Sequence, residues 1–400
     1  MGISDLVRQR MAEGSFIRKM FEEGIALKKI YGDDKVFDLT IGNPIFEPPE
    51  EFNLEMRKLV EKPLPGMHRY MENAGYAETR EAIAAHLKKE SGLDFEASNI
   101  VMTVGTAGAL NSVLKGLLDP GDEVVTFAPY FFEYGVYVDN HGGQLKVLPS
   151  DTNFVPDFAV LEASINPKTK AVIINSPNNP TGAVYSREVL ATLSEILGRK
   201  SAQYGQPIFA ITDDVYAKIY YGEGLCPRIL TSYPNTIVVT SFSKDLALPG
   251  ERIGYAAVHP ACADAREVVN AIIYGNRVLG FVNAPALMQI AVRRLLETSV
   301  SIAEYRRKRD LLCNGLTRLG YSLVKPLGAF YIFPRCPARD DVTFINELKE
   351  MKVLVVPGTP FKAPGYFRIS YCLDDRTLEG SLTGFKALAE KYHLKQRRPE

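Results

Sequence analysis

The stretch TIVVTSFSKDLALPGERIGYAAV, residues 236–258, contains two short apolar runs joined by a polar loop. Both runs have the length and the flanking turn residues that are typical of buried β-strands. The loop between them carries Ser241, Lys244 and Arg252. Alone, Lys244 would be interpreted as a solvated loop lysine. With a guanidinium eight residues later, at the start of the next expected strand, we favour a chemical role for its amine.

Short apolar runs of this kind recur over residues 99–258, where they alternate with segments that have the apolar spacing of helices. We expect strands at residues 99–104, 123–128, 145–148, 170–175, 208–212, 236–240 and 253–258. We expect helices at residues 107–118, 131–140, 158–164 and 186–203. Continuous apolar strands separated by helices indicate a mostly parallel sheet covered on both faces. Ligands of such sheets bind beyond the carboxyl ends of the strands, where Asn179, Asp213 and Lys244 fall.

The pattern changes on both sides of this block. Residues 18–31 have helical apolar spacing, and the residues before them are polar and lid-like. After about residue 286 we expect a long charged helix at 288–319, with a break near Thr298. Short strands are expected at 321–324, 329–333, 353–356 and 366–371, and helices at 342–350 and 375–392. The prediction is an α/β chain whose large domain, residues 46–286, holds a seven-stranded type of sheet, with a smaller α+β domain formed by residues 1–45 and 287–400.

The composition excludes several classes of protein. The 47 basic residues balance 47 acidic ones, which gives no sign of a nucleic-acid or membrane-surface partner. No apolar run approaches the roughly 18 residues of a spanning helix, and the N-terminus lacks a signal core. The five cysteines show no CxxC spacing, so neither a disulfide framework nor a metal site is indicated. We therefore expect a cytoplasmic protein without a metal.

Further polar residues near strand ends match the needs of a lysine that condenses with an aldehyde cofactor. Such a cofactor needs an anion anchor, a carboxylate for its ring nitrogen and hydrogen-bond donors for its ring hydroxyl. Each candidate has a plainer interpretation when it stands alone. Asp213 could be a polar strand-end residue beside Asp214, and Asn179 could belong to a turn before Pro180. The combination with Lys244 favours the cofactor interpretation.

In this order the motifs make the chain similar to the aspartate aminotransferase superfamily, the fold-type I pyridoxal-phosphate enzymes of class I/II. The resemblance covers about residues 41–387 and rests on Gly42-Asn43-Pro44, Gly75 with Arg80, residues 103–107, residues 175–182, Asp213 with Tyr216, residues 241–255 and residues 366–370. It implies pyridoxal 5′-phosphate as cofactor, held by Lys244 as an aldimine. It also implies ping-pong transfer of an amino group from an amino acid to a 2-oxo acid, with aspartate or an aromatic amino acid as donor and 2-oxoglutarate as acceptor.

The resemblance also implies roles for residues around the cofactor. Asp213 would pair with the ring nitrogen, and Tyr216 and Asn179 would donate to the ring hydroxyl. Phe131 would stack on the ring, although core packing is a rival interpretation for this phenylalanine. The phosphate would be bound at a helix start by backbone groups and side chains of Gly105, Thr106, Ala107, Ser241 and Arg252.

Substrate recognition is implied in the same way. Arg368 would clamp the α-carboxylate, with help from Asn179 and the backbone at Gly42. Arg277 from a neighbouring subunit is a candidate for reading a distal carboxylate, and Arg18 is another. In the family a tyrosine of the neighbouring subunit reaches the phosphate, and Tyr70 matches it, which implies a homodimer.

Three other functions were weighed against transamination. A carbon–sulfur β-lyase would use the same cofactor residues, so the motifs do not separate it from an aminotransferase. An effector-binding regulator is disfavoured, because the segment before Gly42 is too short for a winged helix. A Rossmann dehydrogenase is disfavoured because no Gly-x-Gly-x-x-Gly follows a strand. The acids at Asp245 and Glu251 depart from the commonest family motif and indicate a subgroup.

Overall fold

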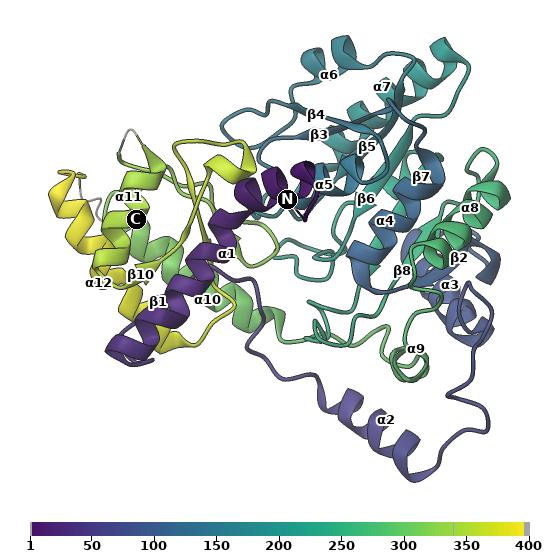
Figure 1. Ribbon diagram of the computed structural model, residues 1–400, viewed down its shortest axis with the longest axis horizontal. Helices are drawn as coiled ribbons and strands as arrows, with labels where there is room; N and C mark the ends of the chain where they lie inside the picture. Colours follow the sequence, from purple (N-terminus) through teal and green to yellow (C-terminus); the bar gives the residue numbers. More distant parts are fainter. Residues whose placement is uncertain (1, 339, 396–400) are drawn as a thin grey trace.

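A seven-stranded sheet forms the centre of the larger part of the computed structural model, which describes residues 2–338 and 340–395 (Figure 1). The order is β2-β8-β7-β6-β5-β3-β4. Strand β8 runs antiparallel to both of its neighbours, whereas the other pairs are parallel, so the predicted mostly parallel sheet is confirmed. The bounds are β2 Ile100–Thr103, β3 Glu123–Phe127, β4 Gln144–Leu148, β5 Thr169–Ile174, β6 Phe209–Asp213, β7 Thr236–Ser241 and β8 Gly254–Val258.

Helices cover both faces of this sheet, and for that reason its central strands are apolar along their whole length. On one face, Val124, Ile173 and Ile211 pack against α4 (Gly105–Leu117), α5 (Glu133–Asp139) and α8 (Ala265–Val278). On the other face, the alternate residues Val125 and Val172 pack against α6 (Phe158–Ser164) and α7 (Arg187–Tyr204). The β2–β8–β7 end of that face packs against α3 (Ala77–Ser91) and α9 (Ala286–Val292).

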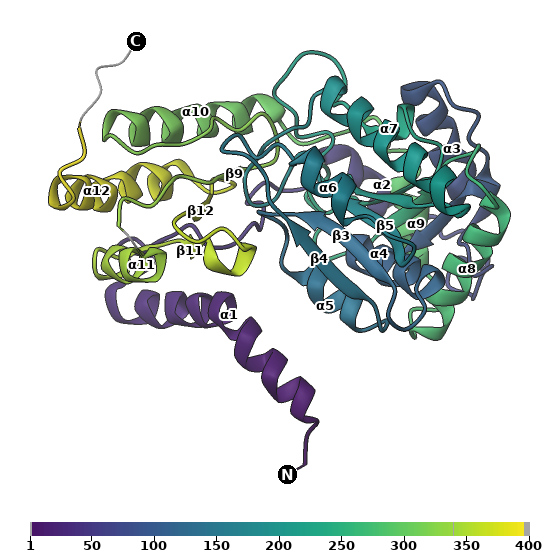
Figure 2. The same ribbon diagram turned by 90° about the horizontal axis from the view of Figure 1, so that it is seen from above.

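The smaller part of the molecule combines both ends of the chain. Strand β1 (Phe37–Asp38) pairs in parallel with β10 (Val353–Leu354), while β11 (Val356–Pro357), β12 (Phe367–Ser370) and β9 (Tyr331–Ile332) form an antiparallel sheet. Figure 2 shows α10, α12, α11 and the C-terminal half of α1 in a row, from which the N-terminal half of α1 departs. The bounds are α1 Asp5–Tyr31, α10 Ile302–Arg318, α11 Asp341–Glu350 and α12 Asp375–Lys391.

Several expectations about local structure were wrong. Helix α1 already begins at Asp5, so the segment before residue 18 is helical. The break expected near Thr298 in the helix at 288–319 is, in contrast, confirmed: α9 ends at Val292, and Ser301 caps a new helix by accepting a hydrogen bond from the Glu304 amide at 3.3 Å. No strand forms at 321–324, where the Tyr321 hydroxyl donates to the Phe385 carbonyl at 2.9 Å and its ring joins the core instead.

Other elements were not expected at all. These are α2 (Glu50–Glu61), α3 and α8, and the single strand expected at 353–356 is divided between two sheets. Within the described ranges, no helix has the length and apolarity needed to cross a membrane. The domain boundaries at residues 46 and 286 are retained as a proposal.

Candidate active site

A cavity of about 360 Å³ lies where the C-terminal edge of the large sheet meets the smaller part of the molecule. Residues that follow β2, β3, β5, β6 and β7 converge there, as expected for a mostly parallel sheet. The structure brings these predicted residues together in its lining: Gly42, Thr106, Ala107, Phe131, Asn179, Asp213, Tyr216, Ser241, Lys244, Arg252 and Arg368.

Lys244 projects into this cavity from the turn that follows β7. Its Nζ donates a hydrogen bond to the Gly42 carbonyl at 2.7 Å. Burial lowers the pKa of Lys244 to about 8. Because a lysine attacks a carbonyl only as the neutral amine, this shift increases its reactivity near neutral pH.

Asp213, rather than its neighbour Asp214, faces the cavity from the end of β6. The Tyr134 hydroxyl donates to Asp213 Oδ2 at 2.6 Å, and the Val215 amide donates to Oδ1 at 3.4 Å. Burial raises the pKa of Asp213 to about 6. Such a buried carboxylate is suited to pair with a protonated ring nitrogen, which would offset the cost of its desolvation.

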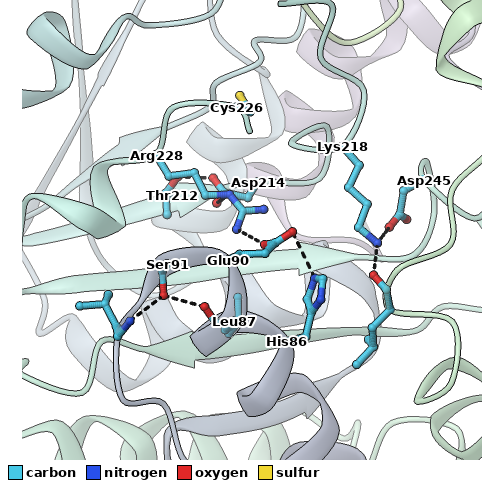
Figure 3. Close-up of polar contacts among 12 residues, drawn as sticks. His86, Leu87, Glu90, Ser91, Thr212, Asp214, Lys218, Cys226, Arg228 and Asp245 are labelled. Atoms are coloured by element: carbon cyan, nitrogen blue, oxygen red, sulfur yellow. Dashed lines mark hydrogen bonds and ion pairs between the residues drawn. The ribbon is translucent and has the colours of Figure 1, made fainter. Parts of the chain in front are cut away.

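The carboxylate of Asp214 points to the opposite side of the strand. It accepts a hydrogen bond from the Thr212 hydroxyl and lies 3.3 Å from Arg228 Nε (Figure 3). Asp214 does not line the cavity. Of the two consecutive aspartates, Asp213 is therefore the one placed to act in the cavity.

Arg368 is a buried cation held by neutral groups. Within the described part of the chain, its Nη1 donates to Asn179 Oδ1 at 2.9 Å and its Nη2 to the Thr40 carbonyl at 2.7 Å. The buried Nε has no hydrogen-bond partner among the described residues. Burial lowers the pKa of Arg368, because the guanidinium loses hydration. An anionic ligand such as a carboxylate would relieve this cost.

The start of α4 forms a cradle with the chemistry that a phosphate requires. Gly105 has φ +67°, and a Cβ at this position would lie 2.7 Å from Arg252 Nη2. The Thr106 Oγ1 is buried without a hydrogen-bond partner among the described residues. Backbone amides at a helix start favour anions. With the Ser241 hydroxyl and the Arg252 guanidinium in the same lining, these residues fit a phosphate group.

Some contacts of the site were not predicted from the sequence. Tyr134 and Tyr331 appear in aromatic runs that would normally be assigned to the core, and their roles depend on tertiary contacts. The Tyr331 hydroxyl lies 3.0 Å from that of Tyr216. A local signal existed only for Asn175, which lies within the motif 175–182. Its Nδ2 donates to the Asp213 carbonyl at 2.9 Å, and its Oδ1 accepts from the Asn179 amide at 2.7 Å.

Tyr70 and Arg277 are predicted site residues that do not line the cavity within one chain. Tyr70 is 91% exposed. Arg277 is exposed in the last turn of α8, with its guanidinium 5.7 Å from the Tyr274 ring centre. The side chain of Arg18 lies outside the described residues. The subunit-bridging roles of Tyr70 and Arg277 stay predictions.

Known proteins resemble this chain over nearly its whole length. The family described as aminotransferase class I and II matches residues 34–383. The aspartate/prephenate aminotransferase of Thermus thermophilus is 36% identical, with 87% of this chain and 89% of that protein covered. The aromatic-amino-acid aminotransferase 2 of Thermococcus litoralis is 32% identical, with 98% and 99% covered.

Solved structures agree with these sequence relatives. The crystal structure of an amino transferase from Eubacterium rectale superposes with a TM-score of 0.94 at 41% identity, covering 98% of this chain and 99% of that one. The aspartate aminotransferase of Thermotoga maritima gives a TM-score of 0.85 at 30% identity, covering 94% and 97%.

Proposed function

Because this chain belongs to the class I and II aminotransferases, we propose that the cavity beside Lys244 is where it transfers amino groups between amino acids and 2-oxo acids. Enzymes of this family use pyridoxal 5′-phosphate. One observation carries the assignment. Lys244, Asp213 and Arg368 line the same cavity at the C-terminal edge of the sheet, although they lie far apart in the sequence.

The cofactor would be held by residues with distinct tasks. Thr106, Ser241 and Arg252, with the backbone at the start of α4, would bind its phosphate. Asp213 would pair with the ring nitrogen, Asn179 and Tyr216 would donate to the ring hydroxyl, and Phe131 would pack on the ring. When bound, the cofactor supplies an aldehyde for amines and a ring that withdraws electrons from the substrate Cα.

The chain's own residues would perform the remaining steps. Arg368 would bind the α-carboxylate of the substrate and so fix the orientation of the bond to the Cα hydrogen. Lys244, as a neutral amine, would take the proton from Cα and return it to a neighbouring carbon. The Asp213 carboxylate would balance the positive charge on the ring nitrogen throughout. The same residues would act in both halves of the ping-pong cycle.

For the substrate class, we infer an aspartate or aromatic donor with 2-oxoglutarate as acceptor. The relatives reported above are named for aspartate, prephenate and aromatic amino acids, which supports this choice. Arg277 of a second subunit, or Arg18, would read a distal carboxylate. None of these relatives is named as a carbon–sulfur lyase, so nothing favours that alternative.

We also infer a cytoplasmic homodimer. Helix α2 lies at the edge of the molecule (Figure 1), where Phe52 and Leu59 pack against α9. Leu54 and Val60 on this helix and Leu64 just after it are exposed. Exposed apolar side chains grouped on one element are typical of an interface. All five cysteines are unpaired, which agrees with a reducing compartment.

An absorbance experiment tests the proposal. Purified enzyme loaded with pyridoxal phosphate is mixed with single amino acids, and the long-wavelength band of the cofactor is followed. We expect the band to disappear with aspartate or aromatic amino acids and to return on addition of 2-oxoglutarate. The Lys244→Ala variant should lack the normal band. Unchanged spectra with every amino acid would contradict the assignment, and pyruvate release without an oxo-acid acceptor would indicate the lyase.

A further inference from the structure

A layer of buried and half-buried charges, drawn in Figure 3, lies next to the active-site cavity, with which it shares the lining residues Val215 and Ser241. Asp213 is the last residue of β6 and Asp214 directly follows it; Asp213 lines the active-site cavity, whereas Asp214 lines the neighbouring one. Asp214 is 3% exposed and lies 3.3 Å from Arg228 Nε. Its Oδ2 has no hydrogen-bond partner among the described residues, so the ion pair with Arg228 is what balances its charge. Arg228 is therefore the cation that compensates this buried carboxylate.

Arg228 connects this aspartate to a distant helix. It precedes the short helix η2 (Ile229–Thr231), and its Nη1 lies 2.9 Å from Glu90 Oε2 on α3. Glu90 Oε1 in turn lies 3.4 Å from His86 Nε2. Burial alone would lower the pKa of Arg228, but Asp214 and Glu90 outweigh it and hold the pKa above its usual value. Arg228 is thus a permanent charge, fixed between carboxylates from two elements.

The ionisation of Asp213 depends on the charges that surround it. Burial raises its pKa to about 6, the hydrogen bond from Tyr134 opposes this shift, and the charge of Asp214 adds to it. The ionisable groups whose charges couple to Asp213 come from α5, from the end of β6 and from the turns after β6 and β7: Tyr134, Tyr137, Asp214, Tyr216 and Lys244. An uncompensated Asp214 would make it harder for Asp213 to lose its proton.

We propose that Arg228 is a positioning residue for the reaction, which holds Asp214 on the far side of β6 and thereby keeps Asp213 available as a carboxylate for the cofactor ring. The inference rests on the proposed role of Asp213. Arg228 does not line the active-site cavity, so it acts through the two aspartates. The neutral ring of a cofactor bound to a protonated Asp213 would withdraw electrons less strongly.

The test measures the affinity of the cofactor-free protein for pyridoxal phosphate as a function of pH. We expect Arg228→Met to move the acidic midpoint of binding upward by about one pH unit, since it leaves a carboxylate uncompensated beside Asp213. Asp214→Asn should move the midpoint downward, and the double variant should return close to the parent value. Arg228→Lys keeps the positive charge, so its midpoint should differ from the parent value by no more than about a third of the shift seen in Arg228→Met.

Two controls separate this effect from a loss of stability. The analogue 1-deazapyridoxal phosphate lacks the ring nitrogen, so the variants should not move its binding midpoint. Lys146→Met breaks a 2.7 Å ion pair with Glu123 at the other end of the sheet and should leave the midpoint unchanged. Equal midpoints in Arg228→Met and Asp214→Asn, or shifts of the same sign, would overturn the proposal. If Arg228→Met does not fold, Asp214→Asn alone tests the proposal: a downward shift of its binding midpoint supports it, and an unchanged or upward-shifted midpoint overturns it.

The proposed role of Asp213 is tested separately by Asp213→Asn. This variant should bind pyridoxal phosphate weakly at every pH. Full affinity would refute the role of Asp213 itself, whereas weak binding together with an unshifted Arg228→Met would refute only the inference about Arg228.

Discussion

At the scale of single residues, burial moves two ionisable groups of the cavity toward neutral pH from opposite directions. The pKa of Asp213 rises to about 6 and that of Lys244 falls to about 8, in both cases because the charged form is desolvated. Between these values the carboxylate is ionised while the amine is still mostly protonated. Only above about pH 8 are both groups in the form that cofactor capture requires.

The pH dependence of cofactor uptake follows from these two pKa values, of which that of Lys244 is the higher. The rate at which pyridoxal phosphate combines with the cofactor-free protein should rise about tenfold per pH unit below pH 8 and level off above it, because a lowered pKa leaves the amine neutral only above that value. Stopped-flow absorbance at constant ionic strength measures the rate. A plateau reached only near the ordinary lysine value of about 10.4 would show that burial does not shift Lys244.

At the scale of elements, there is a physical reason why some secondary-structure predictions were accurate and others were not. The strands of the large sheet were predicted to within about two residues, because burial on both faces makes them continuously apolar. Residues 321–324 also form a short run that is typical of a strand. Tyr321 instead packs its ring against Phe385 in the core and donates its hydroxyl to the Phe385 carbonyl. Short edge strands and packed loops differ only in tertiary contacts, which local pattern does not encode.

The site shows the same division between local and tertiary information. Lys244, Asp213 and Asn179 could be predicted because each belongs to a short motif at a strand end. The contact between Tyr216 and Tyr331 joins residues 115 positions apart, and Tyr134 reaches Asp213 across 79 positions. Arg228 lies in no motif, since its function as a counter-charge exists only after folding.

The start of α4 permits a prediction with a matched control. Gly105→Ala places a Cβ 2.7 Å from Arg252 at φ +67°, whereas Gly92→Ala, at φ +74° after α3, meets no atom within 4 Å. Both variants should lose about 1–2 kcal/mol of stability, because an L-residue is strained at positive φ. Only Gly105→Ala should also lose affinity for pyridoxal phosphate, by about tenfold or more, which corresponds to ~1.4 kcal/mol.

Thermal melting and cofactor titration measure the two quantities. Equal cofactor affinity in the two variants would mean that the close approach of Gly105 to Arg252 is not part of the phosphate cradle. The comparison is valid only if the two variants lose similar stability. We expect this because the two glycines have similar positive φ angles and so similar backbone strain after substitution.

At the scale of the whole molecule, the cavity joins segments from both parts of the chain. Lys244 donates a hydrogen bond to the Gly42 carbonyl, and Arg368 donates one to the Thr40 carbonyl. Two side chains of the site therefore fix the segment after β1. An ion pair of 3.0 Å between Arg10 and Asp139 also connects α1 to α5. What a single chain does not supply is a role for Tyr70, whose ring is almost fully exposed.

Mixed dimers test whether Tyr70 completes the site of a second subunit. Tyr70→Ala and Lys244→Ala protomers are unfolded together and refolded at equal amounts. If Tyr70 acts across a two-fold interface, each hybrid contains one site with both lesions and one intact site. Half of the dimers are hybrids, so activity at limiting pyridoxal phosphate should reach about one quarter of the wild-type value.

The comparison is with the two homodimers, since Lys244→Ala should be inactive and Tyr70→Ala should retain the cofactor poorly. If Tyr70 served the site of its own chain, one hybrid site would lack the lysine and the other the tyrosine, and mixing would restore nothing. Activity of the mixture no higher than the mean of the two homodimers would therefore contradict a shared site. A gain above that mean requires an intact site, which only an exchange of Tyr70 between subunits can create.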